Sequence, residues 1–320
     1  MSETALKSKK ADRGTRWRSL RERIWYNRGI YLFFLPALAA YLVFTYVPMY
    51  GAILAFKDFS FKLGILRSPW TSMNGFQHFY DLLSDASFKK AFFNTVIISF
   101  GRILFEFPVP ILLALLLNEI RKNRYKRFFQ TVFTFPHFVS WIIISGIVFN
   151  LFSDSGVVNG ILVTLGGQKI NVLTQPSTFR AFLYSTSIWK EAGWGTIIYL
   201  ATITGINPSL YEAAIVDGAS RFQLARYITW PSILSVVGVM LILQISSVMN
   251  AGFDQVFNLY NAAVYDKADI IDTLIYRRTF VKGMDFASST AIGLFKSVIN
   301  FAMLLVGNFV VKKATGKGIY

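Results

Sequence analysis

The sequence has no cysteine and only two histidines, and these absences remove several classes of chemistry. Without a thiol the chain forms no disulfide, zinc–thiolate site, iron–sulfur cluster or cysteine nucleophile. His78 and His137 stand far apart in the sequence, which disfavours a histidine metal centre. The patterns G-x-S-x-G, H-E-x-x-H and G-x-x-x-x-G-K-S/T are also missing. We therefore expect no catalytic residues, no metal and no cofactor on this chain.

Charge is scarce as well. Only 16% of the 320 residues are charged, whereas a soluble domain has about a quarter. Hydrophobic residues make up 54% of the chain and the mean hydropathy is +0.46. This composition excludes a disordered chain and argues against a soluble globule. The net charge of +16 would suit nucleic acid, but the basic residues lie in groups between apolar stretches. We therefore predict a membrane protein that binds no nucleic acid.

Long apolar stretches recur along the chain. A helix that crosses a membrane needs about 20 mostly apolar residues, and six stretches satisfy this requirement. They are roughly 29–56, 93–117, 128–152, 179–205, 232–257 and 286–311. The first is too long for a signal peptide, and no small-residue cleavage site follows it. The predicted fold class is an all-α membrane protein with six transmembrane helices.

Basic residues are distributed unevenly among the loops. Residues 1–28, 118–127, 206–231 and the C-terminal tail carry 19 Lys and Arg residues, and the opposite loops carry ten. Because cytoplasmic loops are enriched in Lys and Arg, both termini are expected in the cytoplasm. The basic tail 1–28 would also be attracted to anionic membrane lipid, although its simplest role is to fix the topology.

The loop 206–231 reads as a short helix, a glycine and a second helix. Ser209 and Glu212 have the spacing of a capping box at the start of the first helix. Gly218 permits a bend, and Asp217 just before it would lie unfavourably at a helix C-terminus. This favours either a cationic partner for Asp217 or a helix that continues through the glycine. From the residues alone, an ordinary interfacial helix explains the loop as well.

The order of residues in this loop resembles a known pattern. E-A-A, then D-G-A, then a downstream I-x-x-P is similar to the cytoplasmic EAA loop of binding-protein-dependent ABC importer permeases. In that family the loop is the coupling helix that docks on the ATP-hydrolysing subunit. The resemblance assigns this role to Glu212, Ala213, Ala214, Asp217, Gly218 and Ala219. Trp230 stands where the family usually has leucine before the proline.

Further segments also resemble permeases of this family. Residues 92–95 are similar to the periplasmic end of the family's corresponding helix, and 188–195 resembles carbohydrate permeases related to those for maltose and glycerol-3-phosphate. More narrowly, 117–121, 135–141, 251–258 and 269–276 resemble permeases for polysaccharide-derived, alginate-type oligosaccharides. The resemblance implies a type I ABC importer permease fold over 29–320, in the bacterial inner membrane, that works by alternating access. It also implies a second homologous permease, an ATP-binding subunit dimer that holds ATP and Mg²⁺, an extracytoplasmic solute-binding protein and an oligosaccharide substrate.

Several charged residues lie within the predicted spans, where charges usually face the protein interior. Arg102 and Glu106 are four residues apart and so share one helix face, which predicts a self-neutralising pair. Lys296 lies one turn from Asn300, and we expect a neighbouring helix to hold it. Lys190 has Glu191 next to it as an acidic partner.

Aromatic and polar residues of spans three to five, with Trp141 in span three, are the candidates for contact with sugar. Aromatic rings can stack on the C–H faces of sugar rings, and amides or carboxylates can bind hydroxyl groups. The predicted pathway residues are Trp189, Trp194, Tyr199, Gln244, Asn250, Phe253, Asp254 and Phe257. Asn250 and Asp254 are one turn apart and are expected to share a helix face. Helix packing explains each aromatic residue equally well.

Three alternatives to an importer permease remain open at this point. An ion-gradient-driven secondary transporter or channel would use Arg102, Glu106 and Asp254 as relay groups. A membrane-embedded enzyme would show activity in the single chain, and a basic membrane anchor would have no pathway. The EAA-like loop favours the importer over all three.

Overall fold

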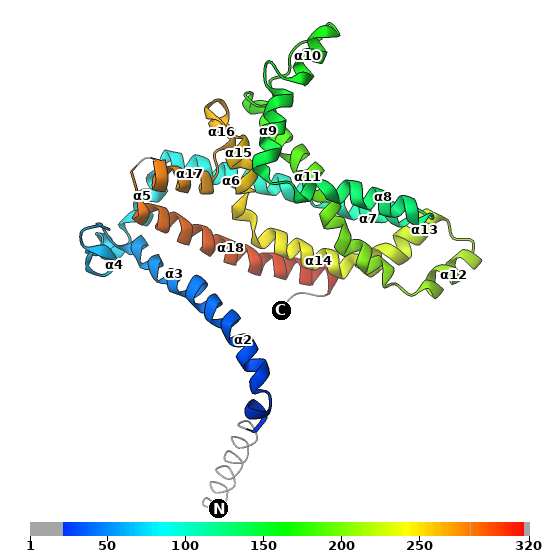
Figure 1. The fold of residues 1–320 in the computed structure, drawn as a ribbon, viewed down its shortest axis with the longest axis horizontal. Helices are drawn as coiled ribbons and strands as arrows, with labels where there is room; N and C mark the ends of the chain where they lie inside the picture. The colour runs from blue at the N-terminus through cyan, green and yellow to red at the C-terminus, as the bar shows by residue number, and fades with distance from the viewer. Residues whose placement is uncertain (1–21, 282, 317–320) are drawn as a thin grey trace, which may run out of the picture.

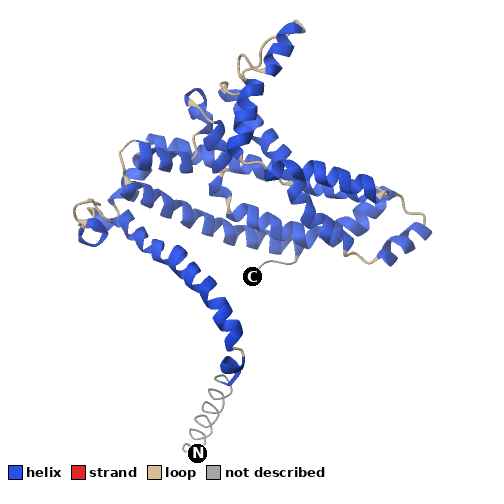
Figure 2. Ribbon diagram, viewed as in Figure 1, coloured by secondary structure: helices blue, strands red, loops and turns tan. Residues whose placement is uncertain are grey.

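Every regular element in the computed structural model is helical among the residues it describes, 22–281 and 283–316 (Figures 1 and 2). The α-helices are α2 (Arg28–Tyr41), α3 (Val47–Met49), α4 (Gly64–Arg67), α5 (Gln77–Ser84), α6 (Ala86–Phe105), α7 (Pro108–Asn118), α8 (Asn123–Thr134), α9 (Trp141–Phe152), α10 (Val157–Thr164), α11 (Pro176–Thr204), α12 (Pro208–Val216), α13 (Arg221–Leu224), α14 (Trp230–Ser246), α15 (Phe253–Leu259), α16 (Tyr265–Ala268), α17 (Ile271–Tyr276) and α18 (Phe286–Thr315).

Short 3₁₀ and π segments connect or extend these helices. The π segments are η1 (Leu42–Tyr46), η5 (Ala225–Thr229) and η8 (Arg277–Val281), and the 3₁₀ segments are η2 (Tyr50–Phe56), η3 (Met73–Gly75), η4 (Phe135–Phe138), η6 (Val248–Asn250) and η7 (Ala262–Val264). The predicted all-α fold class is confirmed for the described residues. Most of the basic tail 1–28 lies outside them.

Five helical stretches of the described chain are long and apolar enough to cross a membrane. They are Arg28–Phe56, Ala86–Asn118, Trp141–Thr164, Arg221–Ser246 and Phe286–Lys313. The fourth predicted span corresponds to α11, whose 29 residues extend about 43 Å, longer than a hydrocarbon core of about 30 Å. It is less apolar because it carries polar residues such as Ser187, Lys190 and Thr196, and these three are buried against protein. Helices α7, α8 and α11, and likewise α14 and α18, pack side by side (Figure 1).

Three of the predicted spans are interrupted. The stretch 128–152 breaks at η4, where α8 gives way to α9, and Figure 1 shows α9 rising away from the long helices. Pro136 lies in this break, and a proline lacks the N–H that would continue the helix. The stretch 93–117 begins earlier, at Ala86, and is divided between α6 and α7 before Pro108.

The stretch 232–257 is also broken, and this corrects the prediction for Asn250 and Asp254. Between α14 and α15 the backbone turns through Ala251 (φ 46°) and Gly252 (φ 71°), both in the left-handed region. Two consecutive left-handed residues end the helical periodicity. Asn250 and Asp254 therefore do not share a helix face. A Cβ at Gly252 would overlap the guanidinium of Arg102, so this position requires glycine.

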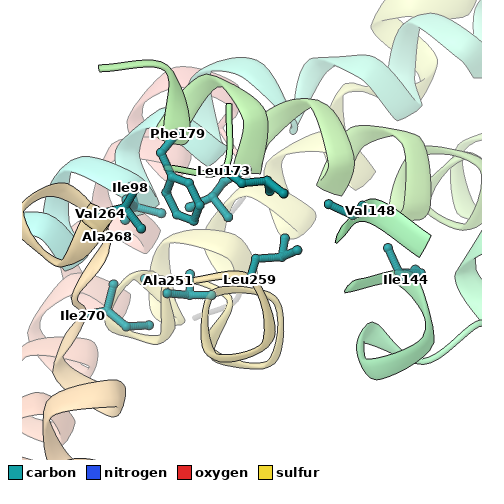
Figure 3. Packing of buried hydrophobic residues seen from close by; sticks show 12 residues of the cluster. Ile98, Ile144, Val148, Leu173, Phe179, Ala251, Leu259, Val264, Ala268 and Ile270 are labelled. Atoms are coloured by element: carbon teal, nitrogen blue, oxygen red, sulfur yellow. The ribbon is translucent and has the colours of Figure 1, made fainter. Parts of the chain in front are cut away.

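The helices are held together by close approach and by buried apolar clusters. Lipid tails are as apolar as leucine, so helices in a membrane associate mainly through tight packing of small residues and through polar contacts. Gly193 of α11 is such a contact, because a Cβ there would overlap the carbonyl of Phe133 in α8. A buried cluster that includes Ile98, Phe179 and Leu259 joins α6, α11 and α15 (Figure 3).

Candidate functional site: a coupling loop and two joined cavities

Helices α12 and α13 project from one end of the molecule (Figure 1). The Asn207 side chain caps α12 by accepting a hydrogen bond from the Ser209 amide at 3.1 Å. The predicted capping box of Ser209 and Glu212 is therefore wrong, because the helix begins at Pro208 and its cap lies two residues before Ser209. The capping box occurs instead at α13, between Ser220 and Gln223.

The bend between α12 and α13 is formed by a left-handed glycine. Helix α12 ends at Val216, and Gly218 follows with φ of 81°. The Ala219 amide donates to the carbonyl of Ala214 at 2.9 Å, which closes the helix end in the manner of a Schellman motif. The helix therefore does not continue through the glycine. The alternative, that Asp217 meets a cationic partner outside this segment, remains a prediction.

The six predicted coupling residues all lie on this projecting unit. Glu212, Ala213, Asp217 and Gly218 are exposed, and Ala214 and Ala219 are half-buried. Apolar side chains are exposed beside them, with 58% of Ile215, 87% of Val216 and 72% of Phe222 accessible. The Glu212 and Asp217 carboxylates form no ion pair with other described residues. This combination of exposed carboxylates, small residues and apolar side chains is suited to docking on another protein.

A large cavity of about 910 Å³ lies between α6–α7, α11 and α14. Its wall includes three of the predicted pathway residues, namely Trp194, Tyr199 and Gln244. A second cavity of about 400 Å³ includes three more, namely Asn250, Phe253 and Asp254. Six of the eight candidates are thus brought to two cavities.

The two cavities share part of their walls. Arg102, Ser187 and Glu191 line both of them, so the polar cluster around Arg102 lies where they meet. The predicted pathway residues did not include these three. Arg102 and Glu191 could have been identified from the sequence, because each is a charged residue within an apolar span. Nothing in the sequence distinguishes Ser187 from other helix serines.

The two remaining candidates do not line either cavity. Trp189 is 57% exposed and has no ring partner among the described residues. Phe257 packs against Phe253 and Tyr276, with ring centroids 5.3 and 4.6 Å apart. Phe257 is therefore a packing residue of this chain, which is the alternative that the sequence left open for each aromatic residue.

Arg102 is the centre of a buried polar network. Its guanidinium contacts the Glu106 carboxylate at 3.1 Å and the Ser187 hydroxyl at 2.9 Å, and it donates to Gln255. Ser187 in turn donates to Glu106 at 2.9 Å. The Gln255 side-chain amide nitrogen donates a hydrogen bond to the Leu183 carbonyl at 2.7 Å. The predicted pairing of Arg102 with Glu106 is confirmed, and the network joins α6, α11 and α15.

Two further charges in the bundle, on Lys296 and Lys190, also have acidic partners. The Lys296 ammonium contacts both oxygens of Asp272 in α17 at 2.7 Å, which confirms that a neighbouring helix holds it. Lys190 lies 3.1 Å from the Glu191 carboxylate and donates to the His137 carbonyl at 2.6 Å. No three His, Asp or Glu side chains gather into a metal-binding group within 22–281 and 283–316.

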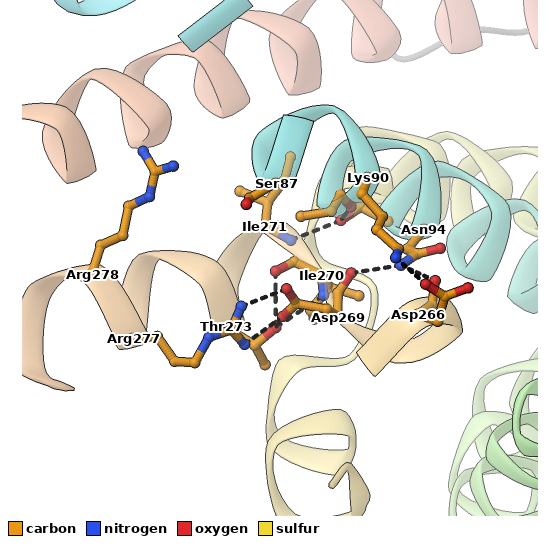
Figure 4. Close-up of polar contacts among 12 residues, drawn as sticks. Ser87, Lys90, Asn94, Asp266, Asp269, Ile270, Ile271, Thr273, Arg277 and Arg278 are labelled. Carbon is orange, nitrogen blue, oxygen red and sulfur yellow. Dashed lines mark hydrogen bonds and ion pairs between the residues drawn. The ribbon is translucent and has the colours of Figure 1, made fainter. Parts of the chain in front are cut away.

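A further set of polar contacts ties α6 to the segment 265–278 at the opposite end from α12 (Figure 4). Arg277 binds Asp269 through two hydrogen bonds of 2.7 and 2.5 Å, and this carboxylate raises the pKa of the guanidinium. Asn94 of α6 donates to the carbonyls of Asp266 and Asp269 at 3.2 and 3.0 Å. Lys90 donates to the Asp266 carboxylate and lowers its pKa. These contacts hold the end of α6 against α16 and α17.

An all-helical bundle with membrane-length helices, an exposed helix–glycine–helix loop and cavities between the helices has the features expected of a transporter permease. Residues 106–315 match the family described as "Binding-protein-dependent transport system inner membrane component". This match spans well over half of the chain. The chain belongs to this family.

Relatives and solved structures agree with this assignment. The chain is 43% identical over 92% of its length to the "Polygalacturonan/rhamnogalacturonan transport system permease protein YteP" of Bacillus subtilis (strain 168), covering 91% of that protein. It is 41% identical over 97% of its length to "Protein LplB" of the same organism, covering 96% of it. It also resembles a chain in the crystal structure of a bacterial ABC transporter involved in the import of the acidic polysaccharide alginate, with a TM-score of 0.84 at 38% identity. That similarity covers 93% of this chain and 99% of the other, and it confirms the type I ABC importer permease fold.

Proposed function

We propose that this chain is the permease subunit of an ATP-driven importer that moves an oligosaccharide, released from a polysaccharide, into the cytoplasm by alternating access. The observation that carries the proposal is the likeness to the alginate importer chain, with a TM-score of 0.84 over 93% of this chain. The cavities add support, because they combine an aromatic ring with amide and carboxylate groups in a volume suited to sugar.

The proposed mechanism needs partners that supply ATP and deliver sugar. The chain has no phosphate-loop sequence, so ATP and Mg²⁺ would bind to a separate ATPase dimer that docks on α12 and α13. A solute-binding protein would deliver the sugar, and a related crystal structure is that of a bacterial alginate ABC transporter in complex with an alginate pentasaccharide-bound periplasmic protein. Helix α2 buries none of its residues against this chain, which leaves it available to lipid or to a second permease.

Transport assays distinguish this function from a secondary transporter. The chain would be expressed with its partner permease, ATPase and binding protein, and uptake of trigalacturonate, alginate pentasaccharide and maltotriose would be measured in vesicles that contain ATP. We expect uptake of at least one acidic oligosaccharide that persists when ionophores collapse the ion gradients and stops when the ATPase is inactivated. Uptake that follows the ion gradient and does not need the ATPase would contradict the proposal.

The proposed orientation has the coupling loop and the loop 118–127 in the cytoplasm. A cysteine introduced at Lys122 should be protected from an impermeant thiol reagent in intact cells, and one at Lys169 should be labelled. Both residues are exposed, and the chain has no native cysteine to label. Lys7 and Lys317 are equivalent cytoplasmic positions outside the described residues. Labelling at Lys122 with protection at Lys169 would reverse the topology.

A further inference from the structure

Helix α8 begins where a membrane-length stretch ends. It follows α7 after the short turn 119–122, and α7 completes the stretch Ala86–Asn118. A connection this short makes the two helices antiparallel neighbours, and α8 also packs along α11 (Figure 1). The first residues of α8 are therefore placed at the membrane surface, and its later residues lie beside the apolar part of α7.

The first turns of α8 carry a concentration of positive charge. Within 121–127 there are five basic residues, and 120–134 contains no acidic residue. The five are Arg121, Lys122, Arg124, Lys126 and Arg127, and none of them forms an ion pair with another described residue. The helix dipole disfavours cations at this end of a helix. The chain itself therefore does not offset this charge.

The exposed face of α8 is cationic at its start and apolar further along. Arg124, Arg127 and Phe128 are exposed and share one face by their helical spacing. Val132 and Phe135 continue this face, and 59% of Phe128, 48% of Val132 and 67% of Phe135 are accessible. Half-buried side chains recur every four residues on the opposite face, at Lys126, Gln130 and Thr134. The polar side of α8 thus faces the protein and the apolar side faces outward.

Charge followed by apolar surface is complementary to an anionic phospholipid. Guanidinium groups bind phosphate oxygens through paired hydrogen bonds, and two arginines three residues apart can hold one phosphate together. The apolar face extends about 10 Å beyond the arginines, from Phe128 to Phe135, in the direction that an acyl chain would take. An ATPase docked on the coupling loop would not reach this depth, so lipid explains both halves of the face.

We propose that the first turns of α8 bind an anionic phospholipid such as phosphatidylglycerol, with its phosphate at Arg124 and Arg127 and an acyl chain along Phe128 and Val132. The site adjoins the proposed docking unit, because Glu119 of the turn before α8 lies 3.8 Å from Arg221 at the start of α13. This inference goes beyond the proposed function and does not depend on which solute is transported.

The test is photo-crosslinking of lipid to the assembled importer in phosphatidylcholine vesicles. Phosphatidylglycerol and phosphatidylcholine analogues with the same photoreactive acyl chain are compared, and crosslinks to 128–135 are quantified by mass spectrometry. The wild type should favour the phosphatidylglycerol analogue at this segment. Arg124→Gln combined with Arg127→Gln should lower the ratio of phosphatidylglycerol to phosphatidylcholine crosslinks about tenfold, equivalent to about 1.4 kcal/mol.

Two further variants separate a lipid site from general charge effects. Arg124→Lys combined with Arg127→Lys keeps both charges and should stay within about threefold of the wild-type ratio. Lys62→Gln combined with Arg67→Gln is the matched control, since it also removes two exposed cations that form no ion pair with described residues. It should leave the ratio at 128–135 unchanged. If the double glutamine variant does not assemble, Arg124→Gln alone should lower the ratio about threefold.

The crosslinks decide the proposal independently of transport. Equal crosslinking of the two analogues to 128–135 in the wild type would overturn the lipid site. Crosslinking of this segment to the ATPase or to the second permease in place of lipid would also overturn it and would assign the face to that protein. Loss of sugar uptake with a retained preference for phosphatidylglycerol would contradict the proposed function and support the lipid site.

Discussion

We expect Gly218→Val to abolish ATP-driven oligosaccharide uptake while the permease still enters the membrane. Gly218 has φ of 81°, a conformation that a β-branched residue adopts only with strain of about 1–3 kcal/mol. A Cβ at this position meets no atom within 4 Å, so the substitution strains the backbone without a clash. The strain would be relieved by a change in the angle between α12 and α13. Because these helices form the proposed docking unit, the ATPase would no longer drive the bundle.

Glu212→Ala tests the same unit without changing its backbone. The carboxylate is exposed and does not cap its own helix, so its loss should leave the fold of the chain intact. Removing one partner of a desolvated charge contact at an interface typically costs about 2–5 kcal/mol. We therefore expect weaker retention of the ATPase on co-purification and a large loss of sugar-stimulated ATP hydrolysis.

Two matched controls separate coupling from general damage. Gly166 has φ of 80° and, like Gly218, open space around it, but it lies after α10, far along the chain from the coupling loop. Gly166→Val should therefore retain ATPase binding. Asp154 is another exposed carboxylate without a described ion pair, and Asp154→Ala should behave as wild type. Normal ATPase retention and uptake in both Gly218→Val and Glu212→Ala would remove the coupling assignment.

The second large effect is expected at the Arg102 network. Glu106→Ala leaves a guanidinium that is 9% exposed without its counter-charge, and breaking a buried pair in this way costs about 3–5 kcal/mol. We expect a strong loss of folded permease, measured as the monodisperse fraction on size-exclusion chromatography and as the thermal unfolding midpoint. Replacing both residues, as Arg102→Leu with Glu106→Leu, should recover much of this loss because no buried charge remains unpaired.

Glu119→Ala is the matched control for this result. Glu119 pairs with Arg221 at 3.8 Å, but the two side chains are 44% and 60% exposed, and such surface pairs contribute about 1 kcal/mol or less. We therefore expect Glu119→Ala to change the thermal unfolding midpoint of the permease only slightly. If Glu106→Ala instead folds normally and only loses ion-driven transport, the pair is a relay of the kind that a secondary transporter would need.

The fold class, the family and one ion pair can be predicted from the sequence alone, because each depends on residues that are close together in the chain or on the summed hydrophobicity of a segment. A lipid environment requires about 20 apolar residues in each crossing helix, so the apolar stretches predict the fold class directly. The order E-A-A, D-G-A lies within the eight residues 212–219, so its resemblance to the EAA loop identifies the family without any long-range contact. The i, i+4 spacing of Arg102 and Glu106 likewise predicts their pairing.

Tertiary structure alone decided which residues meet in the cavities. The left-handed turn at Ala251 and Gly252 places Asn250 and Asp254 off a common face, and the Arg102 guanidinium from another helix packs against Gly252 in this turn. The N-cap of α12 is Asn207 rather than the predicted Ser209, because the first turn of the helix begins at Pro208. His137 and Trp194 stack only because α8 and α11 pack closely at Gly193. Each of these outcomes depends on contacts between helices that are distant in the chain or on the point where a helix begins, and helical periodicity carries no information about either.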